Sequence, residues 1–193
     1  MIKLLFATFN KNKQREAASL LESMVSMVTP SEVGLTDEPD ETAETLEGNA
    51  LIKARFGYKT TGLPCFADDT GLEVAQLNGA PGVHSARYAG ENHNDEANRL
   101  KLLHELISFP QPHIACFRTV IAYIDADGVE HLFEGKVEGR IIPIERGTHG
   151  FGYDSLFVPD GFDRTFAQMT DNEKNTISHR ARALEQFKQF LHK

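Results

Sequence analysis

The sequence has little positive charge and no concentrated basic segment. Its 193 residues carry 20 Lys and Arg against 28 Asp and Glu, which gives a formal net charge of −8. Surfaces that wrap nucleic acid depend on Lys and Arg to neutralise phosphates, so this composition argues against a nucleic-acid partner. It leaves room for a nucleotide ligand, because one cleft can be locally positive in an acidic protein.

Long apolar segments and cysteines are also scarce. The N-terminal apolar stretch, residues 4–7, is far shorter than a signal-peptide core, and no segment approaches the length of a membrane span. The two cysteines, Cys65 and Cys116, each lie in an apolar run. We therefore expect buried, inert thiols rather than a disulfide, and a soluble protein of the reducing cytoplasm without a membrane partner.

Several catalytic signatures are missing. The sequence contains no G-x-x-x-x-G-K-[ST] phosphate loop, and its eight histidines include no H-E-x-x-H pair. No Ser/His/Asp or Cys/His arrangement stands out by spacing, so metal-assisted attack by water is favoured over nucleophilic catalysis. Internal repeats and Ser/Gly-rich linkers are absent as well, which predicts one domain over residues 1–193, with room for two small lobes.

Apolar periodicity predicts a mixed α/β chain with a long antiparallel component. The helix expected near residues 95–107 would bury Leu100, Leu103 and Ile107, and the Thr170-x-x-Glu173 spacing is typical of a capping box. The clearest hairpin turns at residues 125–128. In chain order, the pattern predicts a strand at 2–7, a helix containing Ala17, Leu20, Leu21 and Met24, a loop at 31–40, a helix at 42–58, strands at 64–67 and 72–77, the helix at 95–107, hairpin strands at 114–124 and 129–142, a strand at 156–158, and a final helix containing Ile177, Ala181, Leu184 and Leu191.

The first strand runs into a polar turn that could cradle a phosphate. A helix N-terminus offers free N–H groups and a partial positive charge, and Asn10 or Asn12 is a plausible N-cap here. Thr8 and Asn10 add side-chain donors, and Lys13 adds a full charge in the first turn. The alternative for this segment alone is an ordinary capped turn with a solvated lysine.

A pair of carboxylates, Asp68 and Asp69, follows a short apolar strand. Adjacent strand residues point to opposite faces, so the two carboxylates should have different partners, and one can hold a hard cation. Glu38, Glu41 and Glu44 lie before or within the next predicted helix, and one of them could complete a Mg²⁺ site, which needs few carboxylates. The alternative is a solvated acidic turn.

Near the C-terminus, an aromatic segment is followed by cationic donors. Residues 150–154 read Gly-Phe-Gly-Tyr-Asp, and Lys174 and the sequence Ser178-His179-Arg180 follow. An aromatic face can stack on a base, while Lys and Arg donate to phosphate or carbonyl oxygens. Arg87, in the segment Ser85-Ala86-Arg87-Tyr88, could lie near phosphate or serve as a structural residue at a subunit contact.

Taken together, these segments resemble the inosine triphosphate pyrophosphatase family, also called XTP/dITP diphosphatases. Each motif is weak alone, but six in family order across nearly the whole chain make a chance match improbable. The matching motifs are Ala7-Thr8-x-Asn10-x-x-Lys13, Glu47-x-Asn49-Ala50-x-x-Lys53-Ala54, Ala67-Asp68-Asp69-Thr70-Gly71-Leu72, Gly79-Ala80-Pro81-Gly82-x-x-Ser85-Ala86-Arg87-Tyr88, Gly150-Phe151-Gly152-Tyr153-Asp154 and Glu173-Lys174-x-x-x-Ser178-His179-Arg180.

The resemblance implies a two-lobed α/β fold with an elongated mixed β-sheet, flanking helices and a central substrate cleft. It also implies a homodimer that depends on Mg²⁺ and hydrolyses ITP, dITP and XTP to the monophosphate and pyrophosphate. Two residues depart from the family pattern: Phe9 replaces a small or polar residue, and Ser155 stands where proline is common. Neither change removes a charged or donor group.

Carried over position by position, the resemblance assigns roles to individual residues. Asp69 would be the acidic catalytic residue and a metal ligand, and Glu41 the second metal carboxylate. The residues implied to contact substrate are Thr8, Phe9, Asn10, Lys11, Asn12, Lys13, Thr70, Phe151, Gly152, Tyr153, Asp154, Lys174, His179 and Arg180.

These assignments predict a mechanism. Mg²⁺ would neutralise charge that develops between the α and β phosphorus atoms, while water activated by the metal and a carboxylate attacks in line. Asp68 is an alternative base if Asp69 ligates the metal. Lys13 and Lys174 would stabilise the departing pyrophosphate, and donors near His179 and Arg180 would bind the purine O6.

Two other functions fit the same residues. One is a related house-cleaning pyrophosphatase for modified pyrimidine or methylated nucleotides, with similar metal chemistry and a different base pocket. The other is a non-catalytic nucleotide-binding module, against which the intact Asp68-Asp69 pair and Lys13 argue.

Overall fold

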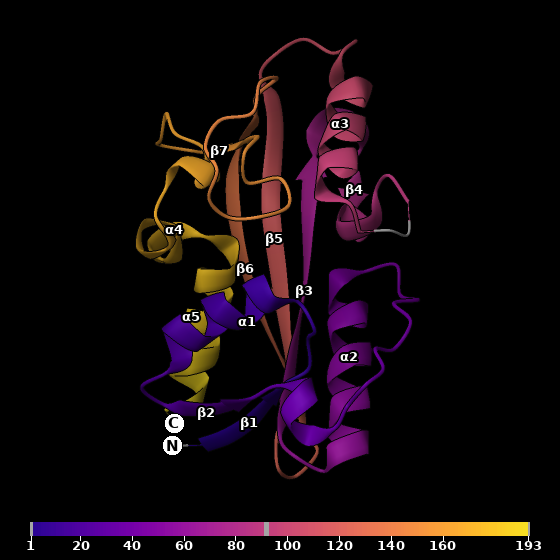
Figure 1. The fold of residues 1–193 in the computed structure, drawn as a ribbon, viewed down its shortest axis with the longest axis vertical. Helices are drawn as coiled ribbons and strands as arrows, with labels where there is room; N and C mark the ends of the chain where they lie inside the picture. The colour runs from indigo at the N-terminus through magenta and orange to yellow at the C-terminus, as the bar shows by residue number, and fades with distance from the viewer. Residues whose placement is uncertain (1, 91–92, 193) are drawn as a thin grey trace. The chain divides into compact units, whose positions relative to one another are not determined.

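The computed structural model describes residues 2–90 and 93–192 and has a mixed α/β architecture (Figure 1). A seven-stranded sheet has the order β2-β1-β3-β5-β6-β7, with β4 paired to β3. The strands are β1 (Ile2–Phe6), β2 (Val25–Val28), β3 (Cys65–Val74), β4 (Pro81–Gly82), β5 (His113–Ile124), β6 (Glu130–Ile141) and β7 (Phe157–Pro159). The α-helices are α1 (Lys11–Leu21), α2 (Leu46–Thr61), α3 (Asp95–Leu106), α4 (Asp171–Ile177) and α5 (His179–Leu191), and short 3₁₀ turns lie at Pro30–Val33, Ala75–Leu77, Ser85–Arg87 and Phe166–Gln168.

The chain forms two compact units. Unit 1 comprises the described residues up to Asp69, the segment Thr119–Gly135 and the residues from Arg180 onward, whereas unit 2 comprises Thr70–Arg118 and Lys136–His179. Two of the unit boundaries fall within motifs, one between Asp69 and Thr70 and the other between His179 and Arg180.

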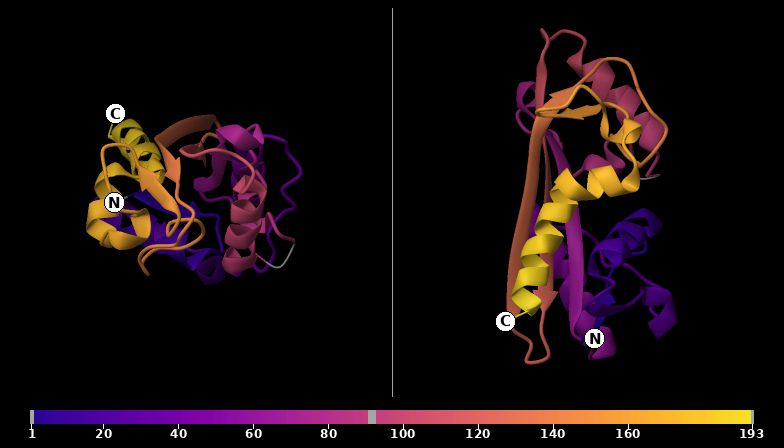
Figure 2. Two further views of the ribbon diagram at one scale, coloured as in Figure 1. Left: turned by 90° about the horizontal axis from the view of Figure 1, so that it is seen from above. Right: turned by 90° about the vertical axis from the view of Figure 1, so that its left-hand side faces the viewer.

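Unit 1 is built on parallel strand pairing and an aromatic core. β1 pairs in parallel with both β2 and β3. Phe6 stacks on Phe66 at a centroid distance of 4.3 Å. α5 lies along the part of the β5–β6 hairpin that belongs to this unit (Figure 2). Its Phe187 ring lies 5.0 Å from that of Tyr123 and 5.4 Å from that of Phe133. Burial of these large rings supplies the apolar driving force for the unit.

Unit 2 has its own core around three phenylalanines. Phe117 of β5 lies edge-on to Phe157 of β7 at 4.7 Å, and Phe157 contacts Phe166 at 5.2 Å. Leu102 and Leu106 of α3 complete the cluster. Antiparallel pairing joins β3 to β4 and β6 to β7 in this unit, so the sheet is mixed, as the sequence pattern predicts.

Several sequence predictions are confirmed. The hairpin occupies β5 and β6, and the Thr170–Glu173 capping box starts α4. Other boundaries were wrong. The second helix begins at Leu46 rather than residue 42, because Thr45 accepts the N–H of Gly48 as its N-cap. The two strands predicted at 64–67 and 72–77 are one continuous strand, β3, and β2 was not predicted. Ile177 ends α4 rather than lying in the final helix.

The buried face predicted for α3 is confirmed only in part. Leu103 is partly buried against the core of unit 2, whereas Leu100 and Ile107 are 59% and 80% exposed. The helix instead buries Leu102 and Leu106 together with the polar Asn98. Asn98 can be buried because its side chain accepts the N–H of Ala89 and donates to the carbonyl of Ala86. Because Asn98 is polar, the apolar pattern of the sequence places it on the exposed face, and the predicted buried face of the helix is rotated accordingly.

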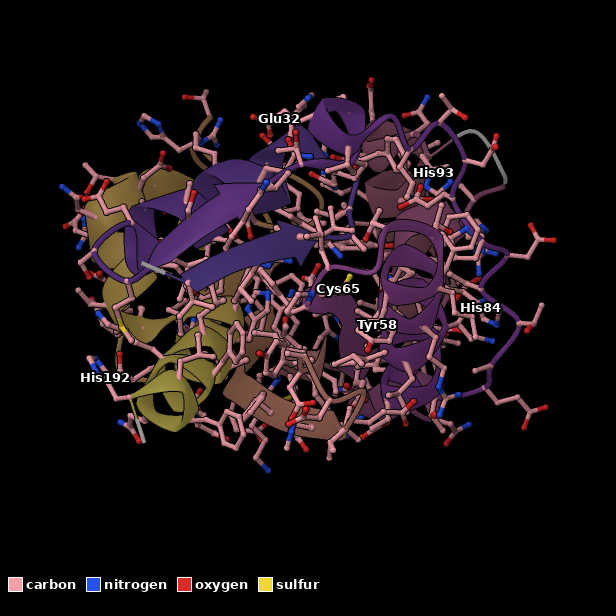
Figure 3. All side chains as sticks on the ribbon, turned by 90° about the horizontal axis from the view of Figure 1, so that it is seen from below. Glu32, Tyr58, Cys65, His84, His93 and His192 are labelled. Carbon is pink, nitrogen blue, oxygen red and sulfur yellow. The ribbon has the colours of Figure 1, made fainter. Side chains whose placement is uncertain are left out.

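The two cysteines are free thiols, and Cys65 lies deep in unit 1 (Figure 3). Burial raises the pKa of Cys65 to about 12 and that of the half-buried Cys116 to about 12. Thiolate is the reactive form of cysteine, so both side chains are unreactive near neutral pH, as expected from their apolar surroundings. Within the described residues, no helix combines the length and the apolar character needed to cross a lipid bilayer.

Gly57 of α2 provides a test of this packing. A Cβ added there would lie 2.6 Å from Cys65 Sγ. We expect Gly57→Ala to lower the free energy of unfolding by about 1–2 kcal/mol, because overpacking outweighs the gain in helix propensity. Adding Cys65→Ala should relieve the overlap, so a double-mutant cycle in urea should give a favourable coupling of roughly 1 kcal/mol.

The control pairs Gly57→Ala with Cys116→Ala, a thiol of unit 2. The effects of these two substitutions should add within roughly 0.5 kcal/mol, as expected for sites without shared partners. Equal additivity in both cycles would contradict the packing explanation.

Candidate functional site

The turn between β1 and α1 is fixed by its own side chains. Asn10 is the N-cap, and its Oδ1 accepts the N–H groups of Asn12 at 3.0 Å and Lys13 at 3.2 Å. The buried Thr8 accepts the N–H of Asn10 through its hydroxyl and the side-chain amide of Gln14 through its carbonyl. The turn is therefore rigidly built, and part of its hydrogen-bonding capacity is used to form the helix cap.

Lys13 extends from the first turn of α1 to the end of the buried segment of β3. Its Nζ lies 3.1 Å from Asp68 Oδ1, and the Asp68 side chain is only 1% exposed. Arg180, from α5, donates through Nε to the other carboxylate oxygen at 3.1 Å. Burial opposes ionisation of Asp68, but the surrounding cations outweigh it and hold the pKa of Asp68 well below its usual range.

A second carboxylate, Glu16 of α1, also binds Arg180. The Arg180 guanidinium donates through Nη1 to Glu16 Oε2, and both side chains are almost fully buried. Sequence reasoning missed Glu16. The available signal was its position three residues after Lys13, which places both side chains on one face of the helix.

Asp69 has entirely different partners from Asp68, as the alternation of side chains along a strand predicts. Its Oδ1 accepts a hydrogen bond from Lys53 Nζ at 2.8 Å, and the same ammonium group donates to Glu41 Oε1 at 2.8 Å. Among the described residues, the buried Asp69 Oδ2 has no hydrogen-bond partner. Burial raises the pKa of Asp69 above its ordinary value, although Lys53 partly offsets that effect.

Helix α2 positions both Lys53 and the segment that carries Glu41. Asn49 is buried on α2 one turn before Lys53, and its Oδ1 accepts the N–H of Ala43 at 2.9 Å. That bond holds the backbone two residues from Glu41. Glu38 and Glu44, the other candidates, are exposed.

The possible metal ligands in the described part of the chain are few. Among the residues described, no group of three or more His, Cys, Asp or Glu side chains is arranged to hold a metal ion. Two carboxylates, those of Asp69 and Glu41, converge on one ammonium group. This donor set suits a hard cation that takes few protein ligands and keeps several waters, which is the preference of Mg²⁺.

Unit 2 contains an aromatic and cationic cluster. Lys174 Nζ lies 2.7 Å from Asp154 Oδ2, and both side chains are buried. The same carboxylate oxygen accepts the N–H of Phe151 at 3.0 Å. Lys174 also lies 5.0 Å from the centroid of the Phe151 ring and 5.7 Å from that of Phe166. The motif residues Phe151, Asp154 and Lys174 are therefore brought together by direct contacts.

His179 is held in unit 2 by ring stacking. Its ring lies 4.6 Å from that of Phe117 with an interplanar angle of 13°, and the residue is 3% exposed. The stack restricts the plane of the imidazole ring. Of the other predicted contact residues, Phe9 and Thr70 are half-buried and Lys11 is exposed.

The Ser85–Tyr88 segment is tied into unit 2. Ser85 Oγ accepts the N–H of Leu72 and donates to the carbonyl of Gly82, while the Tyr153 hydroxyl donates to the Ser85 carbonyl at 2.8 Å. The hydroxyl of Tyr88 donates to Glu105. These bonds give Ser85, Tyr88 and Tyr153 structural roles that the motif alone did not reveal.

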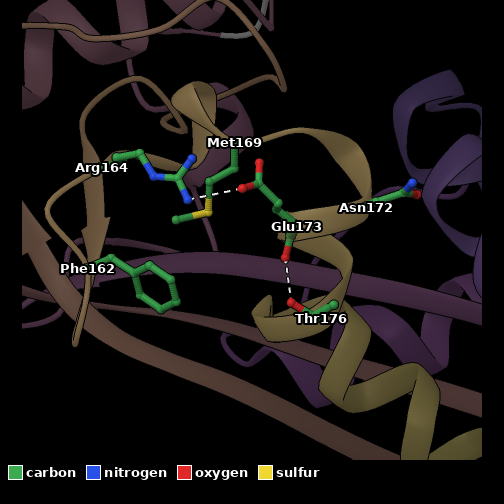
Figure 4. A pocket seen from close by; sticks show the side chains of 6 residues that line it. All are labelled: Phe162, Arg164, Met169, Asn172, Glu173 and Thr176. Atoms are coloured by element: carbon green, nitrogen blue, oxygen red, sulfur yellow. Dashed lines mark hydrogen bonds and ion pairs between the residues drawn. The ribbon is translucent and has the colours of Figure 1, made fainter.

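A cavity of about 340 Å³ lies beside α4 (Figure 4). Arg164 and Glu173 form an ion pair of 3.1 Å at its wall. None of the residues assigned to the site from the motifs lines this cavity. Its lining residues are Phe162, Arg164, Met169, Asn172, Glu173 and Thr176.

Known proteins with similar sequences are named as dITP/XTP pyrophosphatases. A dITP/XTP pyrophosphatase of Porphyromonas gingivalis is 56% identical over 191 residues, covering 99% of this chain and 98% of the relative. One from Christiangramia forsetii is 46% identical over 192 residues and covers both chains fully, at 100% each.

Solved structures and the family model agree as well. The structure of a HAM1 protein from Coxiella burnetii has a TM-score of 0.91 and 39% identity, with coverage of 100% of this chain and 99% of the other. The model of the Ham1 family matches residues 4–190. The resemblance drawn from the six motifs is confirmed, and the chain belongs to the Ham1 family.

Proposed function

We propose that this protein is a pyrophosphohydrolase that converts dITP, ITP and XTP to the nucleoside monophosphate and pyrophosphate. The relatives named above as dITP/XTP pyrophosphatases support the substrate class. The observation that carries the proposal is that two adjacent carboxylates have different partners. Asp68 pairs with the side chains of Lys13 and Arg180. Asp69 has one buried oxygen without a hydrogen-bond partner among the described residues, and Lys53 pairs with both Asp69 and Glu41.

Asp69 and Glu41 are the residues that would hold Mg²⁺. The fit rests on the buried Asp69 Oδ2 and on the shared ammonium group of Lys53, which lies 2.8 Å from Glu41 Oε1 and 2.8 Å from Asp69 Oδ1. When bound, Mg²⁺ would offset the negative charge that develops on the phosphate oxygens during hydrolysis. Lys53 supplies a positive charge between the two carboxylates and holds one oxygen of each by a hydrogen bond.

Asp69 is a better candidate than Asp68 for the general base. A base must be able to take up a proton near neutral pH. Lys13 and Arg180 lower the pKa of Asp68 against the effect of burial, so protonation of that carboxylate is unfavourable. Burial raises the pKa of Asp69, so this carboxylate is the easier of the two to protonate.

The phosphate-binding role falls to Lys13 and Lys174. Burial lowers the pKa of Lys13 even beside Asp68, so an incoming triphosphate would favour the charged ammonium by Coulomb attraction. The Lys13 side chain is 14% exposed, compared with 1% for Asp68. Together with Lys174, it would stabilise the pyrophosphate as the bond to the α phosphorus breaks.

Recognition of the base would use Phe151, His179 and Arg180. The Phe151 ring supplies a stacking face, and donors on His179 and Arg180 would meet the O6 acceptor of hypoxanthine or xanthine. Glu16 and Asp68 fix the plane of the Arg180 guanidinium, so its donors are preorganised. An adenine amino group would face these donors unpaired, and such mispairing can give roughly 10⁴–10⁵-fold discrimination.

We further propose that the enzyme acts in the cytoplasm as a homodimer on free nucleotides. The free thiols of Cys65 and Cys116 support a reducing compartment. The family resemblance supports the dimer, which light scattering on the purified protein would test.

Pyrophosphate release from a panel of nucleotides tests the function. With Mg²⁺, kcat/KM for dITP and XTP should exceed the values for dATP, dUTP and methylated nucleotides by at least about 100-fold. Chelation of the metal should abolish release. Preference for dUTP or a methylated nucleotide would favour the house-cleaning alternative, and binding without any release would favour a nucleotide-binding module.

Replacing Asp69 by asparagine should remove activity while leaving the fold intact. Loss of the base and of a metal ligand is expected to lower kcat for dITP by at least roughly 10³-fold. The Tm should move by only a few degrees, because Glu41 still pairs with Lys53. Near-normal hydrolysis of dITP by Asp69→Asn would contradict the assignment.

Replacing the neighbouring Asp68 should instead affect stability. Asp68→Asn leaves Lys13 and Arg180 short of a buried counter-charge, so we expect a loss of about 3 kcal/mol in the free energy of unfolding. The matched control is Glu130→Gln, which removes the exposed pair with Arg55 and should cost less than about 1 kcal/mol. Equal losses in chemical denaturation would show that Asp68 is not a structural anchor.

A further inference from the structure

The backbone of Gly152 is held on both sides by side chains of α3. Asp95 accepts the Gly152 N–H through Oδ2 at 2.8 Å, and Arg99 donates through Nη1 to the Gly152 carbonyl at 2.9 Å. The two side chains are four residues apart, so they lie on the same face of the helix, one turn after the other. Both hydrogen-bonding groups of one residue in the aromatic segment are thus satisfied by a single helix.

Arg99 is itself fixed by a second contact. Its Nε lies 3.0 Å from Glu145 Oε2, and that oxygen accepts the hydroxyl of Ser155 at 2.7 Å. The Arg99 side chain is 19% exposed. The contacts therefore reach both sides of the aromatic segment, at Glu145 before it and at Ser155 after it.

Gly152 lies between the two motif residues whose positions matter most for the base. Phe151 precedes it, and Asp154 follows two residues later and accepts the Phe151 N–H. Gly152 has a φ of +61°, and a glycine has more backbone conformations available than any other residue. Phe151 is held within the turn by Asp154, which accepts its N–H and donates to its carbonyl, but these two bonds do not hold the N–H and carbonyl of Gly152. The contacts with α3 supply that second constraint on the peptide that follows the Phe151 ring.

We propose that Arg99, together with Asp95, is a positioning residue that clamps Gly152 and thereby fixes the Phe151 ring for stacking on the purine base. This inference rests on the proposed function, because it assumes that Phe151 contacts the base. Arg99 and Asp95 act through the loop backbone and do not themselves touch substrate. Binding of the base should therefore depend on them more strongly than the chemical step does.

The first test is independent of activity. Hydrogen exchange of the Gly152 amide, followed by NMR in ligand-free protein, reports the clamp directly. Arg99→Met removes the bond to the carbonyl but leaves Asp95 as the acceptor of the amide. We expect exchange at Gly152 to accelerate by at least about tenfold, because a peptide held on one side only opens more readily. Unchanged exchange would overturn the proposal.

The second test uses kinetics with dITP. Arg99→Met and Asp95→Ala should each raise KM by about tenfold while kcat falls less than about threefold, since a misplaced ring weakens binding before it affects the attacking water. Asp95→Asn keeps an oxygen acceptor for the Gly152 N–H and should restore KM toward the wild-type value. Equal effects of Asp95→Asn and Asp95→Ala, or parallel losses in kcat and Tm, would overturn the positioning role.

A further variant serves as the control. Arg55→Met removes an exposed Arg in unit 1, whose ion pair is with Glu130 and not with a residue of the clamp. It should leave KM within about twofold of wild type, as is usual for a surface ion pair. If wild-type protein failed to hydrolyse dITP, the proposed function would fall, while the exchange experiment would still decide whether the clamp exists.

Discussion

The ion pairs of Asp68 are the constraint on which unit 1 depends. Lys13 comes from α1 and Arg180 from α5, more than a hundred residues away, and both donate to one carboxylate at the end of a buried strand segment. Removing these charges from water is costly, and only close pairing offsets that cost. Helices α1 and α5 and the middle of β3 must therefore pack together before any of the three charges can be buried.

This pairing also explains why two adjacent aspartates can do different work. The cations around Asp68 make it a permanent anion, suited to structure and not to proton transfer. Asp69 instead accepts a hydrogen bond from Lys53 through Oδ1, and its buried Oδ2 has no hydrogen-bond partner among the described residues. A strand is the simplest way to achieve this separation, because successive side chains leave opposite faces of the sheet.

The sequence predicted those elements well that depend on interactions between residues close in the chain. It predicted poorly those features that depend on contacts with distant segments. The β5–β6 hairpin and the α4 capping box follow from turn and cap chemistry within a few residues. The buried face of α3 depends on Asn98, whose partners Ala86 and Ala89 lie in another segment. Glu16 escaped notice for the same reason, because its partner Arg180 is 164 residues away.

The same reasoning explains why the motifs nevertheless led to the family. A buried charge tolerates few substitutions, because losing one partner leaves the other uncompensated. The charged motif residues Lys13, Lys53, Asp68, Lys174 and Arg180 are all paired at buried or nearly buried positions. Apolar core positions accept many residues of similar volume, so they carry less recognisable sequence information. Segments far apart in the chain are recognisable together where one ion-pair network joins them, as it joins Lys13, Asp68 and Arg180.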